Sequence, residues 1–135
     1  MFHSFELQRR LNSEPKLSNI SVLGVDPGMM PTKITTSTLN WLIRSLFFVV
    51  AQISGRLSPN GMIRLPHKSA GDILAVALES SPPLGKRPKG LYFNGSELKE
   101  VSIEARDAEK RASVWKASVK YAELAGGETC LADWA

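Results

Sequence analysis

A sharp turn, Asp26-Pro27-Gly28, follows an apolar run and is the best candidate for chemistry in this sequence. Proline fixes φ and glycine frees it, so the chain changes direction abruptly at this point. Open α/β sheets bind ligands just beyond the carboxyl ends of their strands, so a turn at this place is a candidate ligand site. Judged on its residues alone, however, the segment is best interpreted as a turn that simply ends a strand, because Pro-Gly is common in that role.

The other reactive side chains are too scattered to form a site. Cys130 is the single cysteine, and the two histidines, His3 and His67, lie far apart in the sequence. The chain therefore has neither a disulfide framework nor a Cys/His cluster for zinc, and we predict no metal site. Cys130 has no histidine neighbour to activate it, so we do not expect it to act as a nucleophile.

The composition is typical of a folded domain. Of the 135 residues, 43% are hydrophobic and 22% are charged, which is too apolar for a disordered chain. The formal net charge of +4 is spread along the chain, so we expect no nucleic-acid partner. The longest apolar stretch, 39–53, is too short to span a bilayer, and the first residues lack the pattern of a secretory signal. We expect a soluble, cytoplasmic protein.

Hydrophobic periodicity predicts alternating helices and strands. Helical spacing predicts helices over 2–11, 39–53, 73–79 and 103–124, and β-branched or aromatic runs predict strands over 18–25 and 90–93. Ser37 or Thr38 is expected to cap the second helix, and Ser69-Ala70-Gly71-Asp72 resembles a capping box before the third. The nearly continuous apolar strand at 18–25 is typical of a parallel sheet that is buried on both faces.

In this order, the segments resemble the fungal branch of the short-chain dehydrogenase/reductase family. NISVLGVDPGMMPT is similar to the stretch in which a late strand enters a Pro-Gly-x-x-x-Thr turn, and FHSFELQRRL resembles the rest of the helix that begins with the catalytic Tyr-x-x-x-Lys. PNGMIRLPHKSAGDILAVAL and PKGLYFNGSELKEVSIEARDAEKRASVWKASVKYAEL are similar to the downstream segments. The resemblance implies an α/β fold for residues 1–135: the carboxyl-terminal part of a Rossmann-like doubly wound parallel sheet, incomplete, with two strands plus flanking helices.

The resemblance also implies one wall of a cofactor site for NADP or NAD. The positions that match the family's motif are Pro27, Gly28, Met30 and Thr32. In the family, the backbone of this turn meets the nicotinamide carboxamide, and the threonine reaches toward the cofactor. The insertion that follows, at about 33–67, covers the substrate in the family.

The apolar helix within that insertion leaves two interpretations open. Residues 39–53 form either a lid for an apolar small-molecule substrate, with peripheral membrane contact as a variant, or an amphipathic helix that packs on the core. The apolar face is broad, and the sequence favours neither interpretation over the other.

Two motifs of the family are absent from these residues. The glycine-rich fingerprint Thr-Gly-x-x-x-Gly-x-Gly, which holds the cofactor pyrophosphate, does not occur. Neither tyrosine is followed by lysine four positions later: Tyr92 is followed by Ser96, and Tyr121 by Ala125. Since a hydride-transfer enzyme of this family needs that tyrosine for proton transfer, we assign no catalytic residue. The chain is expected to be the carboxyl-terminal part of a larger domain.

Three functional classes therefore stay open. The first is an NAD(P)-dependent oxidoreductase acting on an apolar alcohol or ketone, in fungal secondary metabolite biosynthesis. The second is a truncated, inactive relic of such an enzyme, and the third is a non-enzymatic interaction module that pairs with a full-length reductase. Because a two-stranded parallel sheet leaves apolar faces and strand edges uncovered, we also expect a sheet-completing protein partner or self-association.

Overall fold

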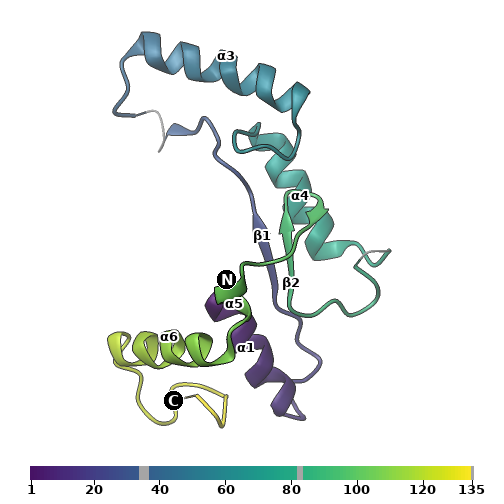
Figure 1. The fold of residues 1–135 in the computed structure, drawn as a ribbon, viewed down its shortest axis with the longest axis vertical. Coiled ribbons are helices and arrows are strands. Elements are labelled where there is room, and N and C mark those ends of the chain that lie inside the picture. Colours follow the sequence, from purple (N-terminus) through teal and green to yellow (C-terminus); the bar gives the residue numbers. More distant parts are fainter. Residues whose placement is uncertain (34–36, 82–83, 135) are drawn as a thin grey trace. The chain divides into compact units, whose positions relative to one another are not determined.

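The fold is α/β, as predicted, in a computed structural model that describes residues 1–33, 37–81 and 84–134 (Figure 1). Its elements, in chain order, are α1 (Phe2–Ser13), β1 (Leu23–Asp26), α3 (Trp41–Leu57), α4 (Pro66–Leu78), β2 (Leu91–Asn94), β3 (Glu97–Leu98), α5 (Ile103–Arg106) and α6 (Ala108–Tyr121). They belong to two compact units. Unit 1 comprises Met1–Gly24, Gly85–Tyr92 and Glu100–Ala135, and unit 2 comprises Val25–Leu84 and Phe93–Lys99.

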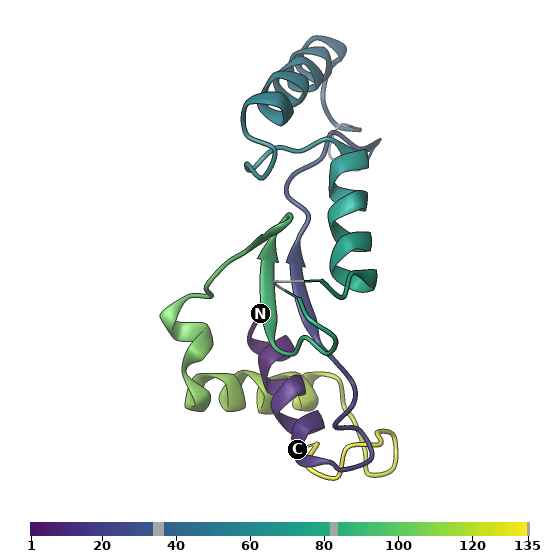
Figure 2. The same ribbon diagram turned by 90° about the vertical axis from the view of Figure 1, so that its right-hand side faces the viewer.

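The sheet has the strand order β1-β2-β3, and its first two strands are parallel. The N–H of Gly90 donates to the Val22 carbonyl at 3.0 Å, and the N–H of Gly95 donates to the Asp26 carbonyl at 3.1 Å. Since the partners advance in the same direction on both strands, β1 and β2 run parallel, and they lie side by side in both views (Figures 1 and 2). The two predicted strands are confirmed.

A short third strand was not expected from the sequence. β3 pairs antiparallel with β2, with Phe93 opposite Leu98 and Asn94 opposite Glu97. The two residues between the strands begin with Gly95, whose φ of +65° is the left-handed conformation that a two-residue hairpin needs. The prediction closed the second strand at Asn94-Gly95, and the structure continues it into a hairpin.

β1 is shorter than the predicted strand. The N–H of Leu17 donates to the Glu14 carbonyl at 3.0 Å, and the N–H of Ile20 donates to the Leu17 carbonyl at 2.9 Å. The second of these turns uses the Ile20 N–H, which a strand over 18–25 would need for pairing, and the strand begins only at Leu23. Leu23 through Val25 are half-buried, and the expected burial on both faces is not reached in this chain.

In unit 1, α1 packs against α6, as both views show (Figures 1 and 2). The predicted opening helix is confirmed, but its buried face is largely polar: Glu6, Gln8 and Arg10 are buried beside Leu11. Gln8 serves the backbone, because its Oε1 accepts from the N–H of Val22 at 2.7 Å. This hydrogen bond attaches α1 to the segment that leads into β1.

A buried charge cluster joins α1 to α6. The carboxylate of Glu6, 1% exposed, accepts from Arg9 Nη2 at 2.7 Å and from Arg10 Nε at 3.0 Å. The Arg10 guanidinium lies 4.8 Å from the ring centre of Trp115 on α6, and the Arg111 Nε lies 4.0 Å from Glu6 Oε2. The charge-assisted hydrogen bonds hold the Glu6 carboxylate within α1, and the ion pair with Arg111 and the cation–π contact with Trp115 connect α1 to α6.

This cluster makes the stability of unit 1 depend on pH. The hydrogen bond from Arg9, together with Arg10, holds the pKa of Glu6 below its ordinary value of 4.5. The stabilisation is therefore complete above pH 4.5 and is lost as the pH falls through the lower, folded-state pKa. We expect the urea midpoint, followed by tryptophan fluorescence, to decline more steeply below pH 4.5 in the unaltered chain than in Glu6→Gln. Parallel curves would contradict this prediction.

The sequence predicts one continuous helix over 103–124, and this is wrong, because the structure has two helices there. Asp107 ends α5 and begins α6, and its Oδ1 accepts from the backbone N–H of Glu109 at 2.9 Å and of Lys110 at 3.2 Å. An aspartate followed by good helix formers is a strong helix start, and this local hydrogen bonding outweighs the apolar spacing across the junction.

The start of α3 differs from the prediction. Asn40 is its cap, and the side-chain oxygen of Asn40 accepts from the Ile43 N–H at 2.9 Å. The expectation that Ser37 or Thr38 caps this helix is therefore wrong, because Asn40 lies next to the first helical residue and is an equally good cap.

The start of α4 also differs. The helix begins at Pro66, which proline favours because its fixed φ suits a first turn. Ser69 and Asp72 consequently lie inside the helix, and the predicted capping box is wrong. Both side chains are buried there: Ser69 donates to the Pro27 carbonyl, and Asp72 pairs with Lys68 of the same helix.

α3 leaves most of its apolar surface exposed. Ala51 is its buried residue, whereas the exposed large side chains are Trp41, Leu42, Ile43, Leu46, Phe48, Val49, Val50, Ile53 and Leu57. The sequence leaves two interpretations of 39–53 open, and the exposed side chains show that this helix does not pack its apolar face on a core in unit 2. Within the described part of the chain, no helix combines the length and the apolarity needed to cross a bilayer.

Candidate functional site

The turn at the end of β1 is held by its own aspartate. Asp26 Oδ1 accepts from the N–H of Gly28 at 2.8 Å, and Gly28 has a φ of +69°. Such a side-chain turn needs a residue that tolerates the left-handed region, which glycine does without a steric penalty. The local residues therefore suffice to shape this turn.

Arg64 connects the turn to the neighbouring loop and strand. Its side chain is 1% exposed, and its guanidinium donates to the carbonyls of Asp26 at 2.7 Å, Gly61 at 2.8 Å and Asn60 at 2.9 Å, and to the side-chain oxygen of Asn94. A planar guanidinium can serve acceptors on several sides at once. Arg64 thus joins the ends of β1 and β2 to the loop before α4.

The chain beyond the turn is held on two sides. The N–H of Met29 donates to the Met62 carbonyl at 2.7 Å, and the N–H of Arg64 donates to the Met29 carbonyl at 2.9 Å. On α4, the hydroxyl of Ser69 donates to the Pro27 carbonyl at 2.6 Å. These bonds fix the backbone of 27–29, so the segment that follows leaves the sheet in a defined direction.

Gly28 makes room for Arg64. A Cβ built at Gly28 would lie 3.0 Å from both Cδ and Nε of Arg64. The family resemblance explains this glycine by the close approach of a cofactor, whereas in the structure an arginine of the same unit fills the space next to it. Packing within unit 2 is therefore sufficient to require glycine at this position.

A second group of polar residues, of which Asp72 is buried and Asn60 and Lys68 are half-buried, lies beside Arg64. Lys68 donates to Asn60 Oδ1 at 3.1 Å and forms an ion pair with Asp72 Oδ1. The hairpin glycine, Gly95, sits against this group, because a Cβ there would lie 2.9 Å from Arg64 Nη1 and 3.1 Å from Asp72 Oδ2. This cluster fastens α4 to the hairpin.

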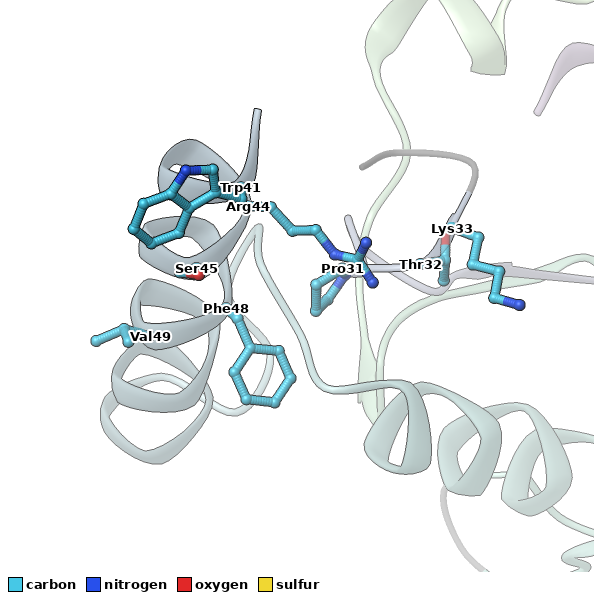
Figure 3. A pocket seen from close by; sticks show the side chains of 8 residues that line it. All are labelled: Pro31, Thr32, Lys33, Trp41, Arg44, Ser45, Phe48 and Val49. Carbon is cyan, nitrogen blue, oxygen red and sulfur yellow. The ribbon is translucent and has the colours of Figure 1, made fainter. Parts of the chain in front are cut away.

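A pocket lies between the segment after the turn and the first half of α3 (Figure 3). Its volume is about 600 Å³, within the range of small-molecule sites. The lining residues are Pro31, Thr32, Lys33, Trp41, Arg44, Ser45, Phe48 and Val49. The predicted site residue Thr32 and the predicted lid helix thus line one pocket.

The lining of this pocket combines apolar and cationic groups. Figure 3 shows the rings of Trp41 and Phe48 on the α3 side, with Arg44 extending from the helix toward Pro31 and Lys33 beyond it. No acidic residue is among the lining residues. The pocket therefore offers an apolar wall and positive charge to a ligand.

The four predicted cofactor residues do not share one environment. Pro27 and Gly28 belong to the turn packed on Arg64 and Ser69, and Thr32 lines the pocket. Met30 connects them: it is half-buried, and its carbonyl accepts from the Thr32 N–H at 2.8 Å.

Two arginines of this region were not among the predicted site residues. Arg64 had no local signal, because its acceptors belong to 26, 60, 61 and 94. Arg44 did have one, since it is a single cation within an otherwise apolar helix. Among the described residues, no group of three or more His, Cys, Asp or Glu side chains is placed to hold a metal.

Comparison with known proteins gives one informative relative. A protein of Talaromyces variabilis described as "Short-chain dehydrogenase iccH" is 41% identical over 133 residues, which is 96% of this chain and 36% of that protein. No family model and no solved structure matches the chain. The chain thus spans about a third of the length of the curated relative it matches. Identity at this level, together with the α/β fold, places these residues in the short-chain dehydrogenase/reductase family, as a carboxyl-terminal portion of such a protein.

Proposed function

We propose that this chain supplies the nicotinamide-side wall and the substrate pocket of an NAD(P)-dependent oxidoreductase. One observation carries the proposal: Thr32, which follows the turn at the carboxyl end of β1, lines the same pocket as the apolar helix α3. In α/β sheets, this end of the strands is where ligands bind. Similarity to a short-chain dehydrogenase supports the same reaction class.

The residues present fit one edge of a nicotinamide cofactor. The Thr32 hydroxyl can donate to or accept from a carboxamide, and the backbone of 27–30 is held in place by Arg64 and Ser69. When bound, the cofactor would supply or accept the hydride. The part of this chain is to bind and orient. We assign proton transfer and pyrophosphate binding to residues outside these 135, since neither motif occurs among them.

The apolar wall supports an apolar alcohol or ketone as the substrate. Trp41, Phe48 and Val49 line the pocket, and such side chains exclude water from a bound hydrocarbon. A role in fungal secondary metabolism is part of the same proposal, and the fungal source of the relative supports it.

Titration calorimetry with NADPH tests the cofactor wall. We expect the purified chain to bind NADPH weakly, since pyrophosphate binding is assigned to residues outside these 135, and Thr32→Ala to weaken binding further by about 3- to 10-fold, because one hydrogen bond of about 1 kcal/mol is lost. Thr32→Ser should keep most of the affinity, since it retains the hydroxyl. Thr38→Ala is the matched control, because Thr38 is exposed and is not among the lining residues.

Two outcomes would contradict the proposal. If NADPH and NADH both fail to bind, these residues do not form a cofactor wall by themselves, which favours the inactive relic or the non-enzymatic interaction module. If Thr38→Ala weakens binding as much as Thr32→Ala, the cofactor does not use this pocket.

A further inference from the structure

We propose that the pocket between 31–33 and α3 binds a substrate that carries an anionic group, most simply a carboxylate, on an apolar body. The anionic group would lie against Arg44, with Lys33 adding positive charge at the edge of the pocket, and the hydrocarbon would lie against Trp41, Phe48 and Val49. The pocket and its lining suffice for the binding site, and the identification of its ligand as the substrate rests on the proposed function.

The two cations of the pocket have no partner among the side chains and backbone groups that the structure describes. The side chains of Arg44 and Lys33 form no ion pair or hydrogen bond with another described residue. Arg9 and Arg64, by contrast, are held by carboxylates or carbonyls of their own units. Arginine is preferred where a carboxylate is bound, because its fork of N–H groups matches the two oxygens.

Nothing in the lining neutralises this positive charge. The other polar lining residues, Thr32 and Ser45, carry hydroxyls, which can donate to an oxyanion as the cations do. Both cations are exposed and stay hydrated beside a wholly neutral substrate, whereas a carboxylate on the substrate would gain charge-assisted hydrogen bonds from Arg44. An organic acid satisfies both parts of the pocket.

The apolar part of the pocket favours a hydrocarbon over a small polar acid. Trp41 is 73% exposed and Phe48 is 52% exposed, so a ligand that covers them gains hydrophobic burial. The volume of about 600 Å³ accommodates a chain of roughly ten carbons. Decanoate is therefore a suitable probe, and decanol is its uncharged counterpart.

Calorimetric titration of the full chain with decanoate, below the concentration at which it forms micelles, tests the site. We expect decanoate to bind at least 10-fold more tightly than decanol. Arg44→Ala should weaken decanoate binding by about 10- to 100-fold, as expected for a charge-assisted hydrogen bond, and leave decanol within twofold. Phe48→Ala should weaken both probes.

The matched controls lie on the same helix. Arg56→Ala removes a second exposed arginine of α3 and Leu42→Ala a second exposed apolar residue, and neither lines the pocket. Both should bind decanoate as the unaltered chain does. The proposal is overturned if decanoate does not bind or if decanol binds equally tightly. It is also overturned if Arg56→Ala loses as much decanoate affinity as Arg44→Ala, because this would show a diffuse electrostatic attraction.

A further titration separates this site from the cofactor wall. With NADPH at saturation, decanoate affinity should stay within twofold, because substrate and cofactor must be bound together. Competition would assign the two cations to a cofactor phosphate and overturn the proposal. Decanoate binding by a chain that binds neither NADPH nor NADH would leave the anion site standing while the proposed function fails.

Discussion

Replacing Arg64 with methionine is expected to lower the free energy of unfolding of unit 2 by about 3 to 5 kcal/mol. The substitution removes the donors to three backbone carbonyls and one side-chain amide. Because the Arg64 side chain is only 1% exposed, these acceptors would be left buried without this donor. Domains of this size are stable by only about 5–15 kcal/mol, so the loss is a large fraction of the total.

Urea denaturation followed by far-ultraviolet circular dichroism measures this effect, and hydrogen exchange locates it. The Gly95 N–H shares the Asp26 carbonyl with Arg64, so its protection should be lost first. Arg64→Lys should recover little, because an ammonium cannot serve acceptors on several sides as a guanidinium does. Arg56→Ala, on the exposed end of α3, should change stability by less than about 0.5 kcal/mol. An unchanged midpoint for Arg64→Met would refute the role of Arg64 in holding the turn.

Replacing Glu6 with alanine is expected to destabilise unit 1 by about 3 to 5 kcal/mol. Arg10 is 3% exposed, and without Glu6 it would lose its buried carboxylate partner while keeping its contacts with Asp133, whose side chain is 56% exposed. Glu6 also faces Arg111 of α6, and the contact between α1 and α6 should loosen with it. Breaking a buried ion pair from one side costs more than the pair contributes when intact.

Tryptophan fluorescence reports on this unit, because Trp115 and Trp134 lie in unit 1 and Trp41, in unit 2, is 73% exposed. Glu109→Gln is the control: it removes an exposed acid of α6 and should cost less than about 1 kcal/mol. The double variant Glu6→Ala/Arg10→Met should be more stable than Glu6→Ala alone, since it removes a buried guanidinium that has lost its buried carboxylate partner. A Glu6→Ala chain as stable as Glu109→Gln would show that the cluster does not hold unit 1.

Features set by neighbouring residues were predictable. α1 follows from helical spacing over 2–11, and the end of β1 follows from Asp26-Pro27-Gly28. The errors arose where two local signals compete. Asn40 outcompeted Ser37 and Thr38 as a cap, and Asp107 divided a helix whose apolar spacing continues across it.

The sequence by itself determined the α/β order of elements, the two parallel strands and the family resemblance, because these depend on patterns repeated along neighbouring residues. The tertiary structure alone decided which distant residues meet. Arg64 fills the space beside Gly28, and Arg44 lies across a pocket from Thr32. A buried cation gains its stability from carbonyls spread over the chain, and a pocket exists only where two segments pack. Neither leaves a mark at a fixed sequence spacing.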